Sequence, residues 1–287
     1  MNQAGRRRVA IQGERGSFSE EAAIRLLGEE IEIVPRATFE GMFSAVGERA
    51  ADCALAPIEN SLAGSVHRSF DLLEEHALSI VGEVIIPIAH NLIGAPGATL
   101  QQIRVVESHP VALAQCERFF IEHPGLKRIA TEDTAGSVRR VVEAGDASRA
   151  AIASRRAAEL YGGAILQEHL EDSSENYTRF LLLSASCEPA RAADKLSIVF
   201  QTAHLPGALH RALEPFARRD INMLKIESRP VHGRPWEYRF YLDLEISASD
   251  PVAVAALEEL RRHSVNLRIL GSYPSAEILR ARKSCGL

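Results

Sequence analysis

Three polar residues stand together after an apolar run in the element "PIENSLAGS". Glu59, Asn60 and Ser61 offer a carboxylate, an amide and a hydroxyl at a strand end, where open α/β sheets place their ligand groups. Such a set can hold the polar groups of a small substrate. A solvated loop has the same composition, so this element alone leaves both interpretations open.

Two further elements place polar side chains after a predicted strand and ahead of a predicted helix. In "ESHPVALAQC", Ser108 ends the strand and Gln115 lies further along, although Ser108 also suits the role of helix N-cap. In "ATEDTAGSV", Glu132 is either an acid of a site or a solvated neighbour of a cap at Asp133 or Thr134. These elements share one feature with the first, which is their position at the strand ends bordering a common cleft.

The element "GERGSFSEEAA" lies where a predicted strand passes into a helix, and backbone N–H groups at such a place can hold an anion. It lacks the third glycine of a dinucleotide fingerprint. Ser17 followed by Glu20 fits a capping box. A tight turn with a capped helix explains the element as well as an anion site does.

The segment "EDSSENYTRFLLLSAS" changes from polar to apolar at Thr178 and Arg179. We expect a buried strand to begin there and to hold Thr178 rigidly toward a cleft. Alternation along the strand turns Arg179 away, which favours a structural ion pair for it. His90, in an apolar run, is expected to be a hydrogen-bonded buried histidine rather than a catalyst.

The first part of the chain alternates short apolar runs with amphipathic Ala-rich ones, a pattern typical of α/β proteins. Strands are predicted at 9–13, 31–35, 53–57, 104–108, 128–132 and 150–154. The apolar segment 78–100 and the polar segment 167–176 are predicted to pass from one lobe to another and back. The expected result is two lobes with a ligand-binding cleft between them.

A second domain is predicted after the small, polar, proline-containing stretch 184–195. Its order βαββαβ is the ferredoxin-like plan. The strands are predicted at 196–202, 222–230, 236–246 and 266–274, and the helices at 206–219 and 250–263. Pro206 and the pair Asp250-Pro251 are placed for helix starts.

The composition is that of an ordinary globular protein, with 46% hydrophobic and 25% charged residues among 287. A net charge of −5 and short basic clusters argue against nucleic-acid binding. No secretory signal or membrane span is apparent. The four cysteines are scattered singly, without metal-binding spacing, which predicts reduced thiols and a cytoplasmic location.

The chain resembles the prephenate dehydratase family, in its monofunctional form with a C-terminal ACT regulatory domain. The resemblance is carried, in order, by "GERGSFSEEAA", "PIENSLAGSV", "SHPVALAQC", "AAIASRRAAELYGGAIL", "NYTRF", "PGALHRAL" and "KIESRP". Seven motifs in sequence order over almost the whole chain are far more specific than any one of them.

The resemblance implies a two-lobed α/β catalytic domain, similar to type II periplasmic binding proteins, followed by a ferredoxin-like ACT domain. The implied parts are the catalytic domain 7–184 (lobes roughly 7–85 plus 175–184, and 90–170), the linker 185–195, the ACT domain 196–274 and the tail 275–287.

The implied activity is decarboxylating dehydration of prephenate to phenylpyruvate, carbon dioxide and water in L-phenylalanine biosynthesis, with no cofactor and no metal. The family's TRF threonine corresponds to Thr178, expected to donate a hydrogen bond or relay a proton to the leaving oxygen. The residues implied to bind substrate are Glu59, Asn60, Ser61, Ser108, Gln115 and Glu132.

The resemblance also implies feedback by L-phenylalanine at the ACT domain and a homodimer or homotetramer. The implied effector-binding residues are Gly207, Ala208, Leu209, Glu227, Ser228, Arg229 and Pro230. Two alternatives stay open: arogenate as the substrate, and a noncatalytic sensor of the same fold, because fold does not fix function.

Overall fold

The structure, a computed structural model, describes residues 5–186 and 192–276. Parts of two predicted segments lie outside the described residues: 187–191 of the linker and 277–287 of the tail. Two of the four cysteines belong to these stretches, and the two that are described, Cys53 and Cys116, are buried free thiols.

The chain divides into two compact units. The first comprises the residues up to Val66 together with Ile85–Phe180, and the second comprises His67–Val84 together with the residues from Leu181 onward. The second unit thus takes in a segment well ahead of the predicted linker. The domain boundaries given above stay a prediction.

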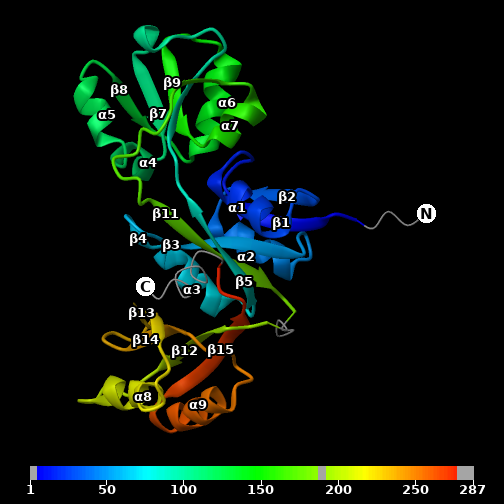
Figure 1. The fold of residues 1–287 in the computed structure, drawn as a ribbon, viewed down its shortest axis with the longest axis vertical. Helices are drawn as coiled ribbons and strands as arrows, with labels where there is room; N and C mark the ends of the chain where they lie inside the picture. The colour runs from blue at the N-terminus through cyan, green and yellow to red at the C-terminus, as the bar shows by residue number, and fades with distance from the viewer. Residues whose placement is uncertain (1–4, 187–191, 277–287) are drawn as a thin grey trace. The chain divides into compact units, whose positions relative to one another are not determined.

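The first sheet has six strands in the order β2-β1-β3-β11-β5, with β4 paired to β3 (Figure 1). Its strands are β1 (Arg7–Gln12), β2 (Ile31–Arg36), β3 (Cys53–Asn60), β4 (Gly64–Ser65), β5 (Ser79–Pro87) and β11 (Tyr177–Ser184). β1 runs parallel to β2 and β3, through the crossover helices α1 (Phe18–Leu27) and α2 (Phe39–Gly47). The boundary between the units falls within β5 and within β11.

The second sheet lies wholly in the first unit and has the order β10-β6-β9-β7-β8. Its strands are β6 (Asn91–Gly94), β7 (Val105–Ser108), β8 (Lys127–Ala130), β9 (Arg149–Ala153) and β10 (Ala164–Gln167). Its helices are η1 (Leu100–Gln102), α4 (Pro110–Ala114), α5 (Glu117–Glu122), α6 (Thr134–Ala144) and α7 (Arg155–Tyr161).

Helices cover both faces of this second sheet, which explains the almost continuous apolar run of β9. Ile152 packs into a core with the phenylalanines of α5, whereas Ala151 and Ala153 pack with α6 and α7. In Figure 1, α5 and the α6–α7 pair lie on opposite sides of β7 and β9.

The ferredoxin-like domain is present as predicted, with an antiparallel sheet in the order β13-β14-β12-β15. Its elements are β12 (Lys195–Gln201), α8 (Ala208–Ala217), β13 (Met223–Pro230), β14 (Tyr238–Leu244), α9 (Pro251–His263) and β15 (Val265–Tyr273). One core joins both helices to the sheet. The prediction for Pro206 was wrong in detail, because Gly207, at φ +74°, is the N-cap and Pro206 precedes it.

All six strands predicted in the α/β part are present, with ends that differ by a few residues. The segment 78–100 is more than a passage between lobes, because it contains β5 and β6. The helix α3 (His67–Glu75) completes the second unit. Within the described ranges, no helix has the length and apolar character needed to cross a bilayer.

Candidate active site

A cavity of about 460 Å³ lies between the two α/β lobes of the first unit. One wall comes from β1, the start of α1 and the end of β3, and the other from residues around α4 and the start of α6. Four of the predicted site residues line it: Asn60, Gln115, Glu132 and Thr178. The expected cleft between lobes is therefore present, and it gathers residues from segments far apart in the chain.

Thr178, the second residue of β11, is 9% exposed and lies on the cavity wall. Its Oγ1 accepts a hydrogen bond of 2.9 Å from Asn60 Nδ2. Because an amide nitrogen can only donate, the threonine's own O–H remains available as a donor. In the described part of the chain no acceptor pairs with that hydrogen. The site thus presents a rigidly held hydroxyl donor to whatever occupies the cavity.

Asn60 is held by the hairpin that joins β3 to β4. Its Oδ1 accepts hydrogen bonds from the backbone N–H groups of Leu62 (3.0 Å) and Ala63 (2.8 Å). These donors orient the amide so that Nδ2 faces Asn176 Oδ1 (2.8 Å) as well as Thr178. The turn after β3 therefore fixes the side chain that positions the threonine.

Gln115 connects the second lobe to this network from the end of α4. Its Nε2 donates to Asn60 Oδ1 (3.4 Å), and its Oε1 accepts from Asn176 Nδ2 (2.9 Å). The same Oε1 lies 2.9 Å from His90 Nε2. Residues of both lobes and both crossing segments are thus joined by one chain of hydrogen bonds.

His90 is a cavity residue that the sequence placed in a structural role. It is 2% exposed, and its backbone N–H donates to Glu171 Oε2 (2.7 Å). Its ring meets Phe18 edge-on at 5.6 Å between centroids. Burial lowers the pKa of His90, against smaller raising effects of the Gln115 hydrogen bond and the Glu171 charge. The prediction of a buried, hydrogen-bonded histidine is confirmed, but the contact with the cavity was missed.

Three other predicted binding residues do not line the cavity. Ser61 Oγ donates to Glu175 O (2.7 Å) and accepts from Tyr177 N (2.9 Å), which ties the β3–β4 turn to β11. Ser108 is fully buried and donates to Ile152 O (2.6 Å). Glu59 lies in the β3–β4 ladder. Alternation along β3 turns Glu59 away from the face on which Asn60 lies. The substrate-binding role of all three residues stays a prediction.

The alternative of Ser108 as a helix cap was wrong, because His109 caps α4 with Nδ1 facing Val111 N (3.3 Å). At α6 the expected cap is confirmed, since Asp133 Oδ1 accepts from Gly136 N (2.6 Å). Gln115 follows α4 as its C-cap rather than lying within the helix.

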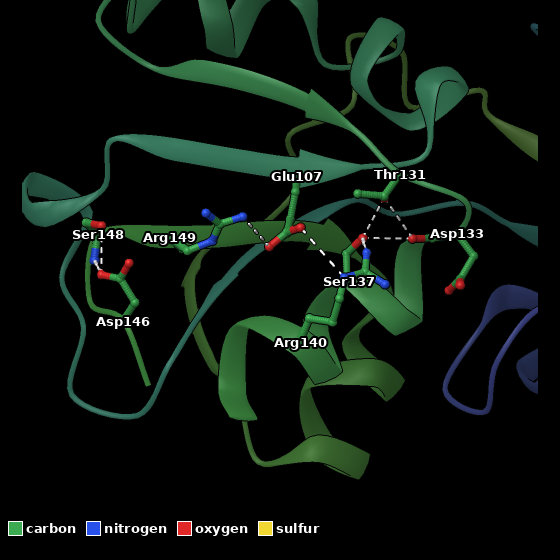
Figure 2. A network of polar contacts seen from close by, with 8 residues as sticks. All are labelled: Glu107, Thr131, Asp133, Ser137, Arg140, Asp146, Ser148 and Arg149. Atoms are coloured by element: carbon green, nitrogen blue, oxygen red, sulfur yellow. Dashed lines mark hydrogen bonds and ion pairs between the residues drawn. The ribbon is translucent and has the colours of Figure 1, made fainter. Parts of the chain in front are cut away.

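A polar network shown in Figure 2 holds the start of α6, and with it Glu132, against the second sheet. Thr131 Oγ1 and Ser137 Oγ are 2.7 Å apart, and both donate toward the backbone carbonyl of Asp133. The buried carboxylate of Glu107 is balanced by Arg149 (3.3 Å) and Arg140 (3.8 Å). Pairing is what permits an acid so deep in the lobe.

The loop ahead of α1 is fastened to the second lobe at Gly16. Gly16 N donates to Glu20 Oε2 (2.5 Å), and Gly16 O accepts from Ser154 Oγ (2.6 Å). Arg156 of α7 pairs with Glu20 at 2.9 Å. The predicted capping box is thus half present: Ser17 caps Glu20 N, but the Glu20 carboxylate serves Gly16 and Arg156 instead of the Ser17 N–H.

Gly16→Ala is expected to destabilise the protein by about 1–3 kcal/mol more than Gly28→Ala, because of overpacking. Both glycines have positive φ, +81° and +84°, so both substitutions carry similar backbone strain. Only at Gly16 does a Cβ meet backbone, at 2.9 Å from Ala157 Cα. Urea unfolding of the two variants measures the difference. Equal losses would show that the contact with α7 is not tight.

The predicted effector-binding residues fall at two places in the second unit. Gly207, Ala208 and Leu209 line a cavity of about 210 Å³ together with Tyr238 and Phe240. The other four belong to β13, where Ser228 lies opposite Phe240 in the register: Glu227, Ser228, Arg229 and Pro230.

Arg229 makes a two-pronged ion pair with Asp71 of α3, with Nε–Oδ1 at 3.1 Å and Nη2–Oδ2 at 2.9 Å. A second arginine of the sheet, Arg239, pairs with Glu74 at 2.8 Å. Tyr241 O–H donates to the carbonyl of Phe70 (2.8 Å). Three side chains of β13 and β14 are thus bound to one short helix.

No group of three or more histidine, cysteine, aspartate or glutamate side chains arranged to hold a metal ion occurs within residues 5–186 and 192–276. The surface of the cavity is mostly apolar, and its polar groups are amides, hydroxyls, imidazoles and the carboxylates of Glu132 and Asp133. An apolar pocket with a few polar groups is typical of a site for a small organic ligand.

These features define a two-lobed α/β protein with a cavity between its lobes and a ferredoxin-like domain after them. The chain belongs to the prephenate dehydratase family. Residues 9–188 match that family, and residues 197–262 match the ACT domain.

Known proteins resemble the chain over nearly its whole length. The Arabidopsis thaliana protein named arogenate dehydratase/prephenate dehydratase 2, chloroplastic, is 42% identical, and the match covers 96% of this chain and 74% of that protein. The solved structure of prephenate dehydratase from Arthrobacter aurescens in complex with L-Phe has a TM-score of 0.86 at 32% identity, covering 93% of this chain and 89% of that one. The structure of GqqA, described as a novel type of quorum quenching acylase, has a TM-score of 0.88 at 36% identity, covering 96% and 100%.

Proposed function

We propose that this protein converts prephenate to phenylpyruvate, carbon dioxide and water. The observation that carries the proposal is the Thr178 hydroxyl, which is held by Asn60 with its hydrogen free to donate at the cavity wall. Membership of the prephenate dehydratase family and the names of its relatives support the same reaction.

The reaction needs little covalent help from the protein. The bond to the ring carboxylate breaks, carbon dioxide leaves, and the electron pair moves through the diene. The bond from the ring to the hydroxyl oxygen then breaks with its electron pair on oxygen, which takes up one proton to leave as water. Aromatisation of the ring drives these steps.

Thr178 acts where negative charge develops, on the departing oxygen. A fixed hydrogen-bond donor at that atom lowers the barrier because it requires no reorganisation when the charge appears. A threonine hydroxyl is too weak an acid to supply the proton alone, so an acid of the cavity wall is needed. Glu132 is the predicted carboxyl group on that wall.

The remaining cavity residues are proposed to hold the two carboxylates of the substrate. The start of α1 contributes Ser17, Phe18 and Ser19 to the wall, next to Gly13. Backbone N–H groups at the start of a ten-residue helix favour a carboxylate there. Gln115 Nε2 and the polar groups around α4 can serve the other end of the substrate.

Arogenate is the competing substrate, because the relative from Arabidopsis thaliana carries both activities in its name. Amide hydrolysis is a second competing activity, suggested by the likeness to GqqA. The geometry favours elimination, because Thr178 Oγ1 faces the amide of Asn60 rather than an imidazole that would activate it as a nucleophile. A noncatalytic sensor of the same fold is the remaining alternative.

One comparison of substrates tests these possibilities. The purified protein is incubated separately with prephenate, arogenate and an N-acyl homoserine lactone, with phenylpyruvate, phenylalanine and released acid as the respective products. We expect the highest kcat/KM for prephenate. A higher value for arogenate would change the substrate, and release of acid alone would favour the acylase. No product from any of the three would contradict all three activities and leave the noncatalytic sensor as the remaining alternative.

We further propose that L-phenylalanine regulates the enzyme through the ACT domain. The likeness to a prephenate dehydratase structure that contains L-Phe supports this, as does the small cavity at the start of α8. Inhibition requires that phenylalanine bind two states of the enzyme unequally. The Arg229–Asp71 pair is a contact through which the effector motif of β13 reaches α3.

Asp71→Asn is expected to shift the L-phenylalanine concentration for half-maximal effect by about fivefold or more, a typical allosteric coupling. Activity without phenylalanine is expected to change little, because Asp71 lies outside the active-site cavity. Glu75→Gln is the matched control, since Glu75 pairs with Arg68 of the same helix. Equal phenylalanine responses of the two variants would contradict the proposed route.

We propose three further assignments, for the oligomeric state, the location and the domain bounds. A homodimer or homotetramer is proposed because ACT domains commonly pair, and sedimentation of the protein tests it. A cytoplasmic location agrees with the free thiols of Cys53 and Cys116. The catalytic domain is proposed to span 7–184 and the ACT domain 196–274, to be tested by limited proteolysis between them.

A further inference from the structure

The hydrogen-bond network of the active site has one fixed direction, which begins at two backbone amides. The N–H groups of Leu62 and Ala63 can only donate, so the atom of Asn60 that faces them must be its carbonyl oxygen. The Asn60 NH₂ group therefore points to β11, where it donates to Asn176 Oδ1. The carbonyl of Tyr177, which can only accept, lies 3.1 Å from the same NH₂ group and agrees with this orientation.

The direction carries on to His90. Because Asn176 Oδ1 accepts from Asn60, its NH₂ group is the one that donates to Gln115 Oε1. Gln115 Oε1 is thus an acceptor, and His90 Nε2, 2.9 Å away, must carry the hydrogen. The neutral imidazole then has its lone pair on Nδ1. The turn after β3 therefore sets the tautomer of His90, which lies in the segment between β5 and β6.

This Nδ1 acceptor is left without a partner. It is buried, and no hydrogen-bond donor within the described residues reaches it. An unpaired buried acceptor destabilises the protein, so a ligand that supplies a donor relieves that penalty. His90 lines the active-site cavity, which is where such a ligand binds.

Prephenate has a single hydrogen-bond donor, the ring hydroxyl, since its other polar groups are two carboxylates and a ketone. Resting on the proposed function, we propose that Nδ1 of His90 accepts a hydrogen bond from the ring hydroxyl of the substrate. Thr178 donates to the same oxygen. With its hydrogen turned to His90, the hydroxyl presents a lone pair to the Thr178 donor, and the carbon–oxygen bond that breaks is held in one orientation.

Two substitutions separate this role from a structural one. Asn in place of His90 retains an acceptor near the position of Nδ1 but loses the contact with Gln115. Gln in place of His90 reaches Gln115 as Nε2 does but lacks the Nδ1 acceptor. A substrate-orienting role predicts that His90→Asn stays closer to wild type than His90→Gln. A structural role predicts the reverse order.

The expected result for His90→Gln is a roughly tenfold higher KM for prephenate with a smaller change in kcat, because the bond is present before the transition state. Phenylpyruvate, which lacks the hydroxyl, serves as the control ligand. Its inhibition constant is expected to be the same in wild type and both variants. A matching loss of phenylpyruvate affinity, or the reverse order of the variants, would overturn the inference.

The outcomes stay separable from the proposed function. Wild-type protein that forms no phenylpyruvate from prephenate contradicts the function and, with it, this role. Wild-type turnover with unaltered KM in His90→Gln contradicts the role of His90 alone. If His90→Gln does not fold, the comparison of prephenate with phenylpyruvate in His90→Asn decides, because an unchanged KM for prephenate supports the acceptor and a loss shared by both ligands rejects it.

Discussion

Thr178→Ala is expected to lower kcat by about 10²–10³-fold, the usual effect of removing one fixed donor from a developing oxyanion. The loss should appear in kcat more than in KM, because the hydrogen bond strengthens as charge grows on the departing oxygen. Steady-state formation of phenylpyruvate measures it. The melting temperature should fall only modestly, since the Asn60 NH₂ group keeps Asn176 Oδ1 and the Tyr177 carbonyl as acceptors.

Thr178→Ser is the matched control for this prediction. It retains the hydroxyl that Asn60 orients, so most of the activity should remain, with some loss because a serine rotates more freely than a β-branched threonine. A Thr178→Ala protein that folds normally and keeps most of its turnover would falsify the assignment. Equal losses in both variants would show that the methyl group rather than the hydroxyl matters.

Lys195→Met is expected to lower the free energy of unfolding by about 3–5 kcal/mol, the typical cost of leaving one buried charge without its partner. Lys195 Nζ lies 3.0 Å from Glu83 Oε2, and the two side chains are 2% and 0% exposed. Glu83 also accepts from the backbone N–H of Ala276 (2.9 Å). Removal of the lysine takes away the ammonium group that lies 3.0 Å from the fully buried Glu83 carboxylate. Urea unfolding followed by circular dichroism gives the value.

Two controls belong to this measurement. The double variant Glu83→Gln with Lys195→Met removes both charges and keeps an acceptor for Ala276, so it should recover much of the stability. Arg155→Met breaks an ion pair with Glu168 in which both side chains are about half exposed, and should cost at most about 1 kcal/mol. If Lys195→Met costs no more than Arg155→Met, burial does not govern this pair.

Local pattern was enough to predict most of the elements. The apolar run of β9 predicts a strand covered on both faces, and Asp250 followed by Pro251 indicates the start of α9. The order βαββαβ predicted the antiparallel sheet of the last domain. Such signals are contained in neighbouring residues, because hydrophobic period, caps and proline act over one or two turns of chain.

Partners distant in sequence were not predictable in the same way. The Glu20 carboxylate was expected to complete a capping box, but it serves Gly16 and Arg156, the latter from α7. Arg229 was expected at an effector site, and that role stays a prediction, whereas the structure pairs its guanidinium with Asp71. A charged side chain has several possible partners, and which of them lies nearest depends on how the elements pack.

The candidate active site shows most clearly which features the sequence predicts and which only the tertiary structure decides. Sequence motifs pointed to Thr178, Asn60 and Gln115 as residues of one site, and to their polar chemistry. The fold supplied the direction of the hydrogen bonds, the unpaired nitrogen of His90, and the exclusion of Ser108 from the cavity. Hydrogen bonds act over about 3 Å and depend on which face of a strand a side chain occupies. Composition and spacing along the chain do not determine such contacts. The contacts form only when the lobes and crossing segments pack together.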